Sequence, residues 1–143
     1  MSGHLSSSRP QTLRLRLPCS LTEVRRAAQA ARSFLAQQGC TEKDLMDYEL
    51  AIVEACNNAI KYVAERGRNK PVLMEVLCDT TEVELRITDH TPGFEWPEKS
   101  SLPDAESESG RGLYLIRALM DHAHYLRSSG ENVLVLRKSR RQR

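Results

Sequence analysis

The spacing of apolar and polar residues changes along this chain and predicts where its strands and helices lie. Strands are predicted at 12–17, 72–78 and 82–89, where apolar and polar residues alternate, and in a closing hairpin at 124–127 and 132–137. Helices are predicted at 21–38, at 41–66 and directly after Gly112, where apolar residues recur three and four positions apart. This order of elements predicts an α+β fold, a two-layer sandwich in which three helices cover one face of a five-stranded mixed or antiparallel sheet.

The longest predicted helix carries a polar stripe beside its apolar one. Glu54, Asn58 and Lys61 follow one another at offsets of four and three, which place them on one face of a helix. A solvated surface with an ordinary ion pair is one interpretation, but two consecutive asparagines are unfavourable in the middle of a helix. An acid, an amide and a cation in line could also hold a magnesium nucleotide. Asp47 and Glu65, on the same stripe, are expected at an ordinary surface.

Asp89 continues the apolar side of the strand predicted at 82–89. Val83, Leu85 and Ile87 face one side of this strand, and Asp89 is in phase with them. A carboxylate on the core side is costly unless another group pairs with it. The sequence therefore predicts that some group pairs with Asp89.

Residues 90–109 have no period and contain three prolines, one glycine and several serines and glutamates. A loop of about twenty residues in a compact domain is usually a functional lid or disordered. Gly110 and Gly112 follow it, ahead of the third helix, where glycines let backbone N–H groups and the positive end of the helix face an anion. No strand–Gly-x-Gly-x-x-Gly–helix unit occurs in the sequence, so Rossmann and P-loop folds fit poorly.

Composition narrows the class of protein without changing the predicted fold. A chain of 143 residues is expected to form one domain at 11–137, between a flexible N-terminus at 1–10 and a basic tail at 138–143. The apolar runs are too short for a membrane span and the N-terminus lacks the apolar centre of a signal peptide, so a cytoplasmic protein is expected. The four cysteines lie far apart in the sequence, which argues against a zinc site and against disulfides.

The net charge of +2 hides an asymmetry between the body of the chain and its C-terminus. Five basic residues lie from Arg137 onward, and without them 16 basic residues face 19 acidic ones, a charge of −3. A tail this short, without interleaved aromatic residues, is more typical of a disordered solubilising end than of a nucleic-acid contact. No direct nucleic-acid binding is therefore expected.

Three motifs occur in a fixed order along the predicted elements. They are Glu-x-x-x-Asn at Glu54–Asn58 on a helix, Asp-x-x-x-Gly at Asp89–Gly93 after a strand, and Gly-x-Gly at Gly110–Gly112 opening a later helix. Together they resemble the nucleotide-binding pattern of the GHKL ATPase and kinase superfamily. The resemblance covers roughly residues 13–137 of this chain. Within that superfamily the runs at 54–60 and 110–121 are most similar to the anti-sigma-factor serine/threonine kinases, the RsbW- and SpoIIAB-like group.

The resemblance implies the Bergerat ATP-binding fold, with ATP and Mg²⁺ as cofactors. Asn58 would offer its amide oxygen to Mg²⁺, and Glu54 would be the general base for an acceptor hydroxyl. Asp89 would accept a hydrogen bond from the adenine amino group. Gly93 would leave room for the base, the glycines of the last motif would present N–H groups to the phosphates, and Arg111 or Lys61 would add positive charge. The nucleotide-binding set implied beyond Asn58 and Asp89 is Lys61, Thr91, Gly93, Gly110, Arg111, Gly112 and Leu113.

The implied function is that of an ATP-dependent serine/threonine-protein kinase and anti-sigma factor. It would sequester a sigma factor or another regulator, phosphorylate a STAS-domain anti-anti-sigma protein, and form a homodimer. Thr91 stands where the family usually has a glycine, and Glu106 and Glu108 place negative charge just before the glycine motif. Two alternatives therefore stay open: a non-catalytic ATP-binding regulatory module that sequesters a partner, and a detached histidine-kinase-like ATPase domain.

Overall fold

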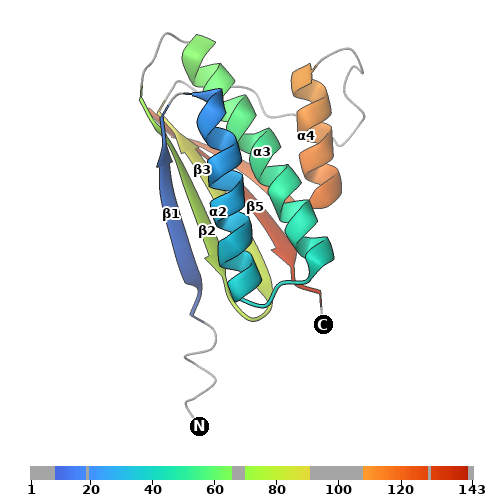
Figure 1. The fold of residues 1–143 in the computed structure, drawn as a ribbon. Helices are drawn as coiled ribbons and strands as arrows, with labels where there is room; N and C mark the ends of the chain where they lie inside the picture. The colour runs from blue at the N-terminus through green and yellow to red at the C-terminus, as the bar shows by residue number, and fades with distance from the viewer. Residues whose placement is uncertain (1–8, 19, 66–69, 91–107, 129, 142–143) are drawn as a thin grey trace.

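The computed structural model describes residues 9–18, 20–65, 70–90, 108–128 and 130–141, with the backbone alone at 65 and 108–111. One antiparallel sheet has the strand order β1-β2-β3-β5-β4. Its strands are β1 (Gln11–Leu17), β2 (Val72–Cys78), β3 (Glu82–Asp89), β4 (His122–Ser128) and β5 (Glu131–Ser139). The helical elements are the short 3-10 helix η1 (Leu21–Glu23), α2 (Val24–Gln37), α3 (Glu42–Glu65) and α4 (Glu108–Leu119). Helices α2, α3 and α4 cover one face of the sheet (Figure 1), so the predicted α+β two-layer sandwich is confirmed.

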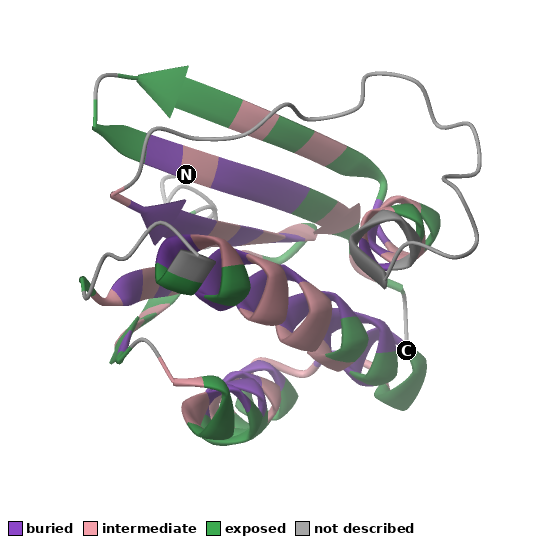
Figure 2. Ribbon diagram, turned by 90° about the horizontal axis from the view of Figure 1, so that it is seen from above, coloured by how far each residue is buried: buried purple, intermediate pink, exposed green. Residues whose placement is uncertain are grey.

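Helix α3 lies at the centre of the helical layer, between α2 and α4 (Figure 1). Its first turn is capped by Thr41, whose Oγ1 accepts a hydrogen bond from the Asp44 amide at 3.2 Å. Gly39 ends the preceding helix with a φ of +87°, a conformation that glycine adopts at little cost. The apolar side of α3 is buried against the sheet (Figure 2), and this packing fixes the direction in which its polar stripe points.

The face of the sheet turned away from the helices carries ion pairs across the strands. Arg14 on β1 lies opposite Glu75 on β2, with Nε and Oε2 2.8 Å apart. Glu84 on β3 accepts hydrogen bonds from Arg86 and, at 2.7 Å, from Arg137 on β5. Burial alone would raise the pKa of the Glu84 carboxyl, but the hydrogen bonds and charges of the two arginines outweigh burial and lower it.

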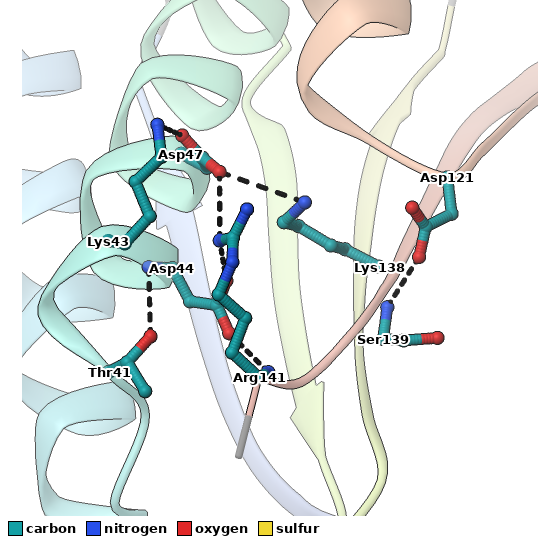
Figure 3. A network of polar contacts seen from close by, with 8 residues as sticks. All are labelled: Thr41, Lys43, Asp44, Asp47, Asp121, Lys138, Ser139 and Arg141. Atoms are coloured by element: carbon teal, nitrogen blue, oxygen red, sulfur yellow. Dashed lines mark hydrogen bonds and ion pairs between the residues drawn. The ribbon is translucent and has the colours of Figure 1, made fainter. Parts of the chain in front are cut away.

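The basic C-terminal tail was expected to be disordered, but its described residues, 138–141, form an ordered cluster. Strand β5 continues to Ser139, and beyond it Arg141 binds Asp44 on α3 through its amide, at 2.7 Å, and through its guanidinium (Figure 3). Asp47, one turn along α3, is 5% exposed and lies 3.7 Å from Lys138 Nζ, so the prediction of an ordinary surface residue is wrong. Buried carboxylates need counter-charges, and the basic C-terminal residues supply them here.

Two further features of the described residues bear on the class of protein. No helix among them is long and apolar enough to cross a membrane. Cys40, Cys56 and Cys78 are buried and form no disulfide among the described residues, and burial raises the pKa of Cys56 to about 12. A thiol that stays protonated is a poor nucleophile, so Cys56 serves as a small apolar residue of the core.

Candidate functional site

Glu54 and Asn58 lie one turn apart on α3, and both are half-buried where this helix meets α4. Gly112 of α4 is buried directly against them. A Cβ atom on Gly112 would lie 2.8 Å from Glu54 Oε2 and 3.2 Å from Asn58 Nδ2. A real Cβ atom does not come within 3.0 Å of another non-bonded heavy atom, so Glu54 keeps this position against α4 because residue 112 has no side chain. The structure thus brings together three residues that the sequence placed on two separate motifs.

Helix α4 begins at Glu108, whereas the sequence predicted a helix only after the glycines. The N–H groups without an intrahelical partner belong to the first four residues of a helix. Gly110 is one of these residues and Gly112 is not. In this structure Gly112 therefore permits close approach of the helices, and Gly110 lies where a free N–H can face an anion.

Asp89 ends β3 with its side chain on the core side and only 4% exposed, as its phase in the strand predicts. Asn132 lies directly opposite it on β5 and donates a hydrogen bond from Nδ2 to Asp89 Oδ1 at 3.0 Å. Sequence reasoning missed Asn132, because its pairing depends on a strand register that the local pattern does not reveal. The sequence did offer one signal, because Asn132 is a polar residue just before the apolar residues of this strand. The structure buries it completely.

A small cavity of about 20 Å³ lies between α3, α4 and the adjoining strands. It is lined by Ala55, Asn58, Ala59, Ile87, Asp89, Leu113, Tyr125 and Leu134. Asn58, Asp89 and Leu113, predicted from three different motifs, therefore share one cavity. Apolar walls with an amide and a carboxylate at fixed points suit a flat heteroaromatic ring. The cavity has room for about one water molecule, so a ring can enter only if α4 moves away from α3.

The remaining predicted site residues do not line the cavity, and some of them lie outside the described residues. Lys61 is exposed on α3, three residues beyond Asn58, outside the lining of the cavity. The backbone of Arg111 lies in the first turn of α4. Thr91 and Gly93 lie outside the described residues. The structure therefore assembles the part of the predicted site contributed by α3, β3 and α4.

The amide of Asn58 has chemistry that fits a metal ion. Its Nδ2 atom is buried and has no hydrogen-bond partner within the described part of the chain. A buried polar group left without a partner costs about 1–3 kcal/mol. Rotation of the amide exchanges its nitrogen and oxygen, so the oxygen can turn toward a cation. Mg²⁺ takes oxygen ligands from one or two side chains together with phosphates and water, so the amide oxygen of Asn58 suits it as a ligand.

Comparison with known proteins gives matches over most of the chain. A family model described as a histidine kinase-like ATPase domain matches residues 17–138. The serine-protein kinase RsbW of Bacillus subtilis (strain 168) is 28% identical, over 68% of this chain and 67% of that protein. The serine-protein kinase RsbW of Staphylococcus aureus (strain MSSA476) is 25% identical, over 88% of this chain and 86% of that protein.

Two solved structures share the fold. One contains the RsbU and RsbW domains of a Mycobacterium tuberculosis protein, with a TM-score of 0.67, 19% identity and coverage of 93% of this chain. This chain spans about a third of that protein (34%). The other is the SiaB–SiaC complex of Pseudomonas aeruginosa, with a TM-score of 0.65, 14% identity and coverage of 95% of this chain and 92% of its match. At these identities the likeness concerns the fold alone.

Proposed function

Because this chain belongs to the histidine kinase-like ATPase domain family, we propose that it is an ATP-dependent serine/threonine-protein kinase acting as an anti-sigma factor in a partner switch. One observation carries the proposal. Glu54 and Asn58 lie under Gly112, and Asn58 shares a cavity with the buried carboxylate of Asp89. This arrangement would supply a base, a metal ligand and a recognition point for a nucleobase within one site.

The residues of the site divide the chemistry among themselves. Glu54 takes the proton from an acceptor hydroxyl as that oxygen attacks the terminal phosphoryl group of ATP. Asn58 would hold Mg²⁺, which when bound would neutralise charge on the phosphates. Asp89 accepts a hydrogen bond from the amino group of adenine, and Asn132 keeps its carboxylate in place through the 3.0 Å hydrogen bond. Product ADP leaves when α4 separates from α3.

Four residues complete the proposed nucleotide site with less direct support. Thr91 and Gly93 would border the adenine after β3, where the sequence motif places them. Arg111, beside the free N–H groups at the start of α4, and Lys61, exposed on α3, would contribute positive charge toward the phosphates. The contribution of Arg111 and Lys61 is electrostatic, so replacing either of these two residues should affect nucleotide affinity less than replacing Asp89.

The proposed partners are those that the resemblance in sequence implies. The acceptor would be a serine or threonine of a STAS-domain anti-anti-sigma protein, and the sequestered protein a sigma factor or a similar regulator. The protein would act in the cytoplasm as a homodimer, without contact to membrane or nucleic acid. Relatives named serine-protein kinase support the choice of a hydroxyl over a histidine as the acceptor.

A transfer assay tests the kinase function. The protein is incubated with ATP labelled on the γ-phosphate and with a STAS-domain protein from the same genome. Label should appear on the STAS protein in an acid-stable linkage, typical of phosphoserine or phosphothreonine, and Glu54→Gln and Asn58→Ala should each abolish it. Acid-labile label on another protein would point to histidine as the acceptor. Transfer that persists at the wild-type rate in both variants would contradict the roles assigned to these residues.

One observation favours a second candidate function, a regulator that binds nucleotide without turning it over. The cavity between α3 and α4 holds about 20 Å³, and α4 lies directly over Glu54. If α4 moves only far enough to admit the nucleotide and still covers Glu54, an acceptor hydroxyl cannot reach the carboxylate. Saturable ATP binding without phosphotransfer to any STAS protein would favour this regulator over the kinase.

A further inference from the structure

Two buried cysteines meet at the end of the molecule where α3 begins. Cys40, in the connection between α2 and α3, is 3% exposed, and Cys78, the last residue of β2, is 2% exposed. The thiol of Cys78 forms a hydrogen bond with the side chain of Cys40, and this contact is the first of the causes that raise the pKa of Cys78. The connection between α2 and α3, the β2–β3 turn and the C-terminus lie at the same end of the fold (Figure 1). The fold alone brings the two sulfurs together, because α3 and β2 separate them in the sequence.

The guanidinium of Arg140 is fixed beside this pair of cysteines. Its Nη1 atom lies 3.7 Å from Cys78 Sγ and donates a hydrogen bond to the carbonyl of Asp79 at 2.6 Å. Its Nη2 atom donates a hydrogen bond to the carbonyl of Gln38, two residues before Cys40, at 2.6 Å. A positive charge beside a thiol favours the thiolate. The charge of Arg140 accordingly acts to lower the pKa of Cys78, against the larger effects of Cys40 and burial.

Tyr48 of α3 adds an unused hydrogen-bond donor to these residues. It is 1% exposed, and its hydroxyl has no hydrogen-bond partner within the described part of the chain. Burial raises the pKa of this hydroxyl, and the charges of Asp44, Cys40 and Cys78 raise it further, so the hydroxyl stays protonated. A buried donor without an acceptor is costly to the fold. A thiolate within the thiol cluster, which consists of Cys40, Tyr48, Cys78 and Arg140, would supply that acceptor.

We propose that Cys40 and Cys78 are a redox pair, which hydrogen peroxide closes to a disulfide and a thiol reductant reopens. Two thiolates in contact repel each other, so the pair loses one proton before the other. Because the hydrogen bond with Cys40 raises the pKa of Cys78, Cys78 keeps its proton and Cys40 is the sulfur that ionises first. Both sulfurs are buried, and hydrogen peroxide is an oxidant little larger than water. The thiol cluster shares no residue with the nucleotide cavity, so this chemistry is independent of the proposed kinase function.

One molecule of peroxide supplies the whole oxidation. The Cys40 thiolate attacks one oxygen of the peroxide, so that an S–O bond forms as the O–O bond breaks, and the other oxygen leaves as hydroxide and takes up the proton that Cys40 released. The sulfur of Cys78 then attacks the sulfenic acid at Cys40, an S–S bond forms, and the hydroxyl group leaves as water with the proton of Cys78. The two thiols together lose two electrons, and the peroxide is reduced to two molecules of water. The new bond encloses α3 and β2 in one covalent loop.

Peptide mapping tests the redox pair. The full chain is treated with hydrogen peroxide, the remaining thiols are alkylated in denaturant, and the tryptic peptides are analysed by mass spectrometry with and without reductant. Trypsin cuts after Lys43 and Lys61, so Cys40, Cys56 and Cys78 fall in separate peptides. The peptides of Cys40 and Cys78 should appear as one cross-linked species, lighter by two hydrogens than their sum, which reductant separates. Cys56 is the matched control, because burial alone raises its pKa, and it should be alkylated in full.

Three variants and a melting curve distinguish the pair from general oxidation. Cys78→Ala should lose the cross-linked species, and Cys56→Ala should retain it. Tyr48→Phe, which removes only the hydroxyl, should slow cross-linking about fivefold, the effect of one hydrogen bond to the reacting sulfur. The cross-link in the wild-type protein should raise the midpoint of thermal unfolding by about 5 °C or more, because it closes a loop around α3, and reductant should reverse the rise.

Three results would overturn the redox pair. One is a cross-link that joins Cys40 or Cys78 to any other cysteine or to a second chain. Another is oxidation of both sulfurs to sulfinic acid without a cross-link between them. The third is oxidation of Cys56 at the same rate as Cys40 and Cys78, because it would show that peroxide acts on the unfolded chain.

Discussion

Gly112 is the point at which α4 reaches the two polar residues of α3 without a side chain between the helices. The oxygen that an added Cβ would strike is the end of the flexible Glu54 side chain, at 2.8 Å. Such a contact is relieved by a change of the glutamate rotamer, at little cost to the fold. Alanine is also favoured over glycine in a helix by about 1 kcal/mol, which offsets part of the strain. The consequence of a methyl group here should therefore appear in the chemistry more than in stability.

We predict that Gly112→Ala lowers the rate of phosphotransfer about 10²-fold, the lower end of what a positioned general base contributes. The midpoint of thermal unfolding should shift by only a few degrees, a change of about 1 kcal/mol or less in a domain of this size. Rate and unfolding are measured on the same preparation. If the effect runs through Glu54, then Glu54→Gln should cost far less in the Gly112→Ala background than alone. Additive losses would contradict this mechanism.

At the scale of elements, predictability followed the strength of the local pattern. Strands β2 and β3 and helix α3 have a sustained period, and their observed bounds differ from the predicted ones by about a residue. The start of α4 lies among Ser, Glu and Gly residues without a period, and it was missed by several positions. The partners of Asp44 and Asp89 could not be predicted from the local sequence, because Arg141 and Asn132 lie 97 and 43 residues away along the chain. Only the register of β5 brings them together.

The C-terminal cluster leads to a prediction about the stability of the fold. Asp44 is fully buried on α3, and Arg141 is the cation bound to it (Figure 3). Arg141→Ala should lower the free energy of unfolding, because the buried carboxylate of Asp44 loses the guanidinium that faces it. Arg127→Ala, at an exposed residue of β4, is the matched control and should change it by less than about 0.5 kcal/mol. Urea unfolding measures both. Asp44→Asn in the Arg141→Ala background should recover part of the loss, and no recovery would contradict the charge argument.

For the whole molecule, α3 separates the region that stabilises the fold from the region that carries the chemistry. The C-terminal cluster binds the first turns of this helix at Asp44, and the candidate site lies at Asn58. Fourteen residues of α-helix between them span about 21 Å. Changes in the cluster should therefore alter the population of folded protein without altering the affinity of the folded protein for nucleotide. The acid-sensitive groups lie on a third surface, the sheet face turned away from the helices and its β2–β3 turn.

Glu84 and Asp79 predict how stability depends on pH. Burial would raise the pKa of each carboxyl, but it is outweighed at Glu84 by Arg137 and Arg86, and at Asp79 by the amides of Glu82 and Thr81. Both folded-state pKa values thus lie below the unfolded values of 4.5 and 3.8. An unfolded state that binds more protons makes stability rise with pH, so this contribution is complete above about pH 5 and is lost as the pH falls through the folded-state pKa values.

Urea unfolding from pH 7 to pH 3 should show a plateau followed by a decline. Glu84→Gln should lower the plateau and flatten the decline, because the glutamine cannot titrate. If stability declines as steeply in Glu84→Gln as in the wild-type protein, the hydrogen bonds of Glu84 with Arg86 and Arg137 are not the source of the decline.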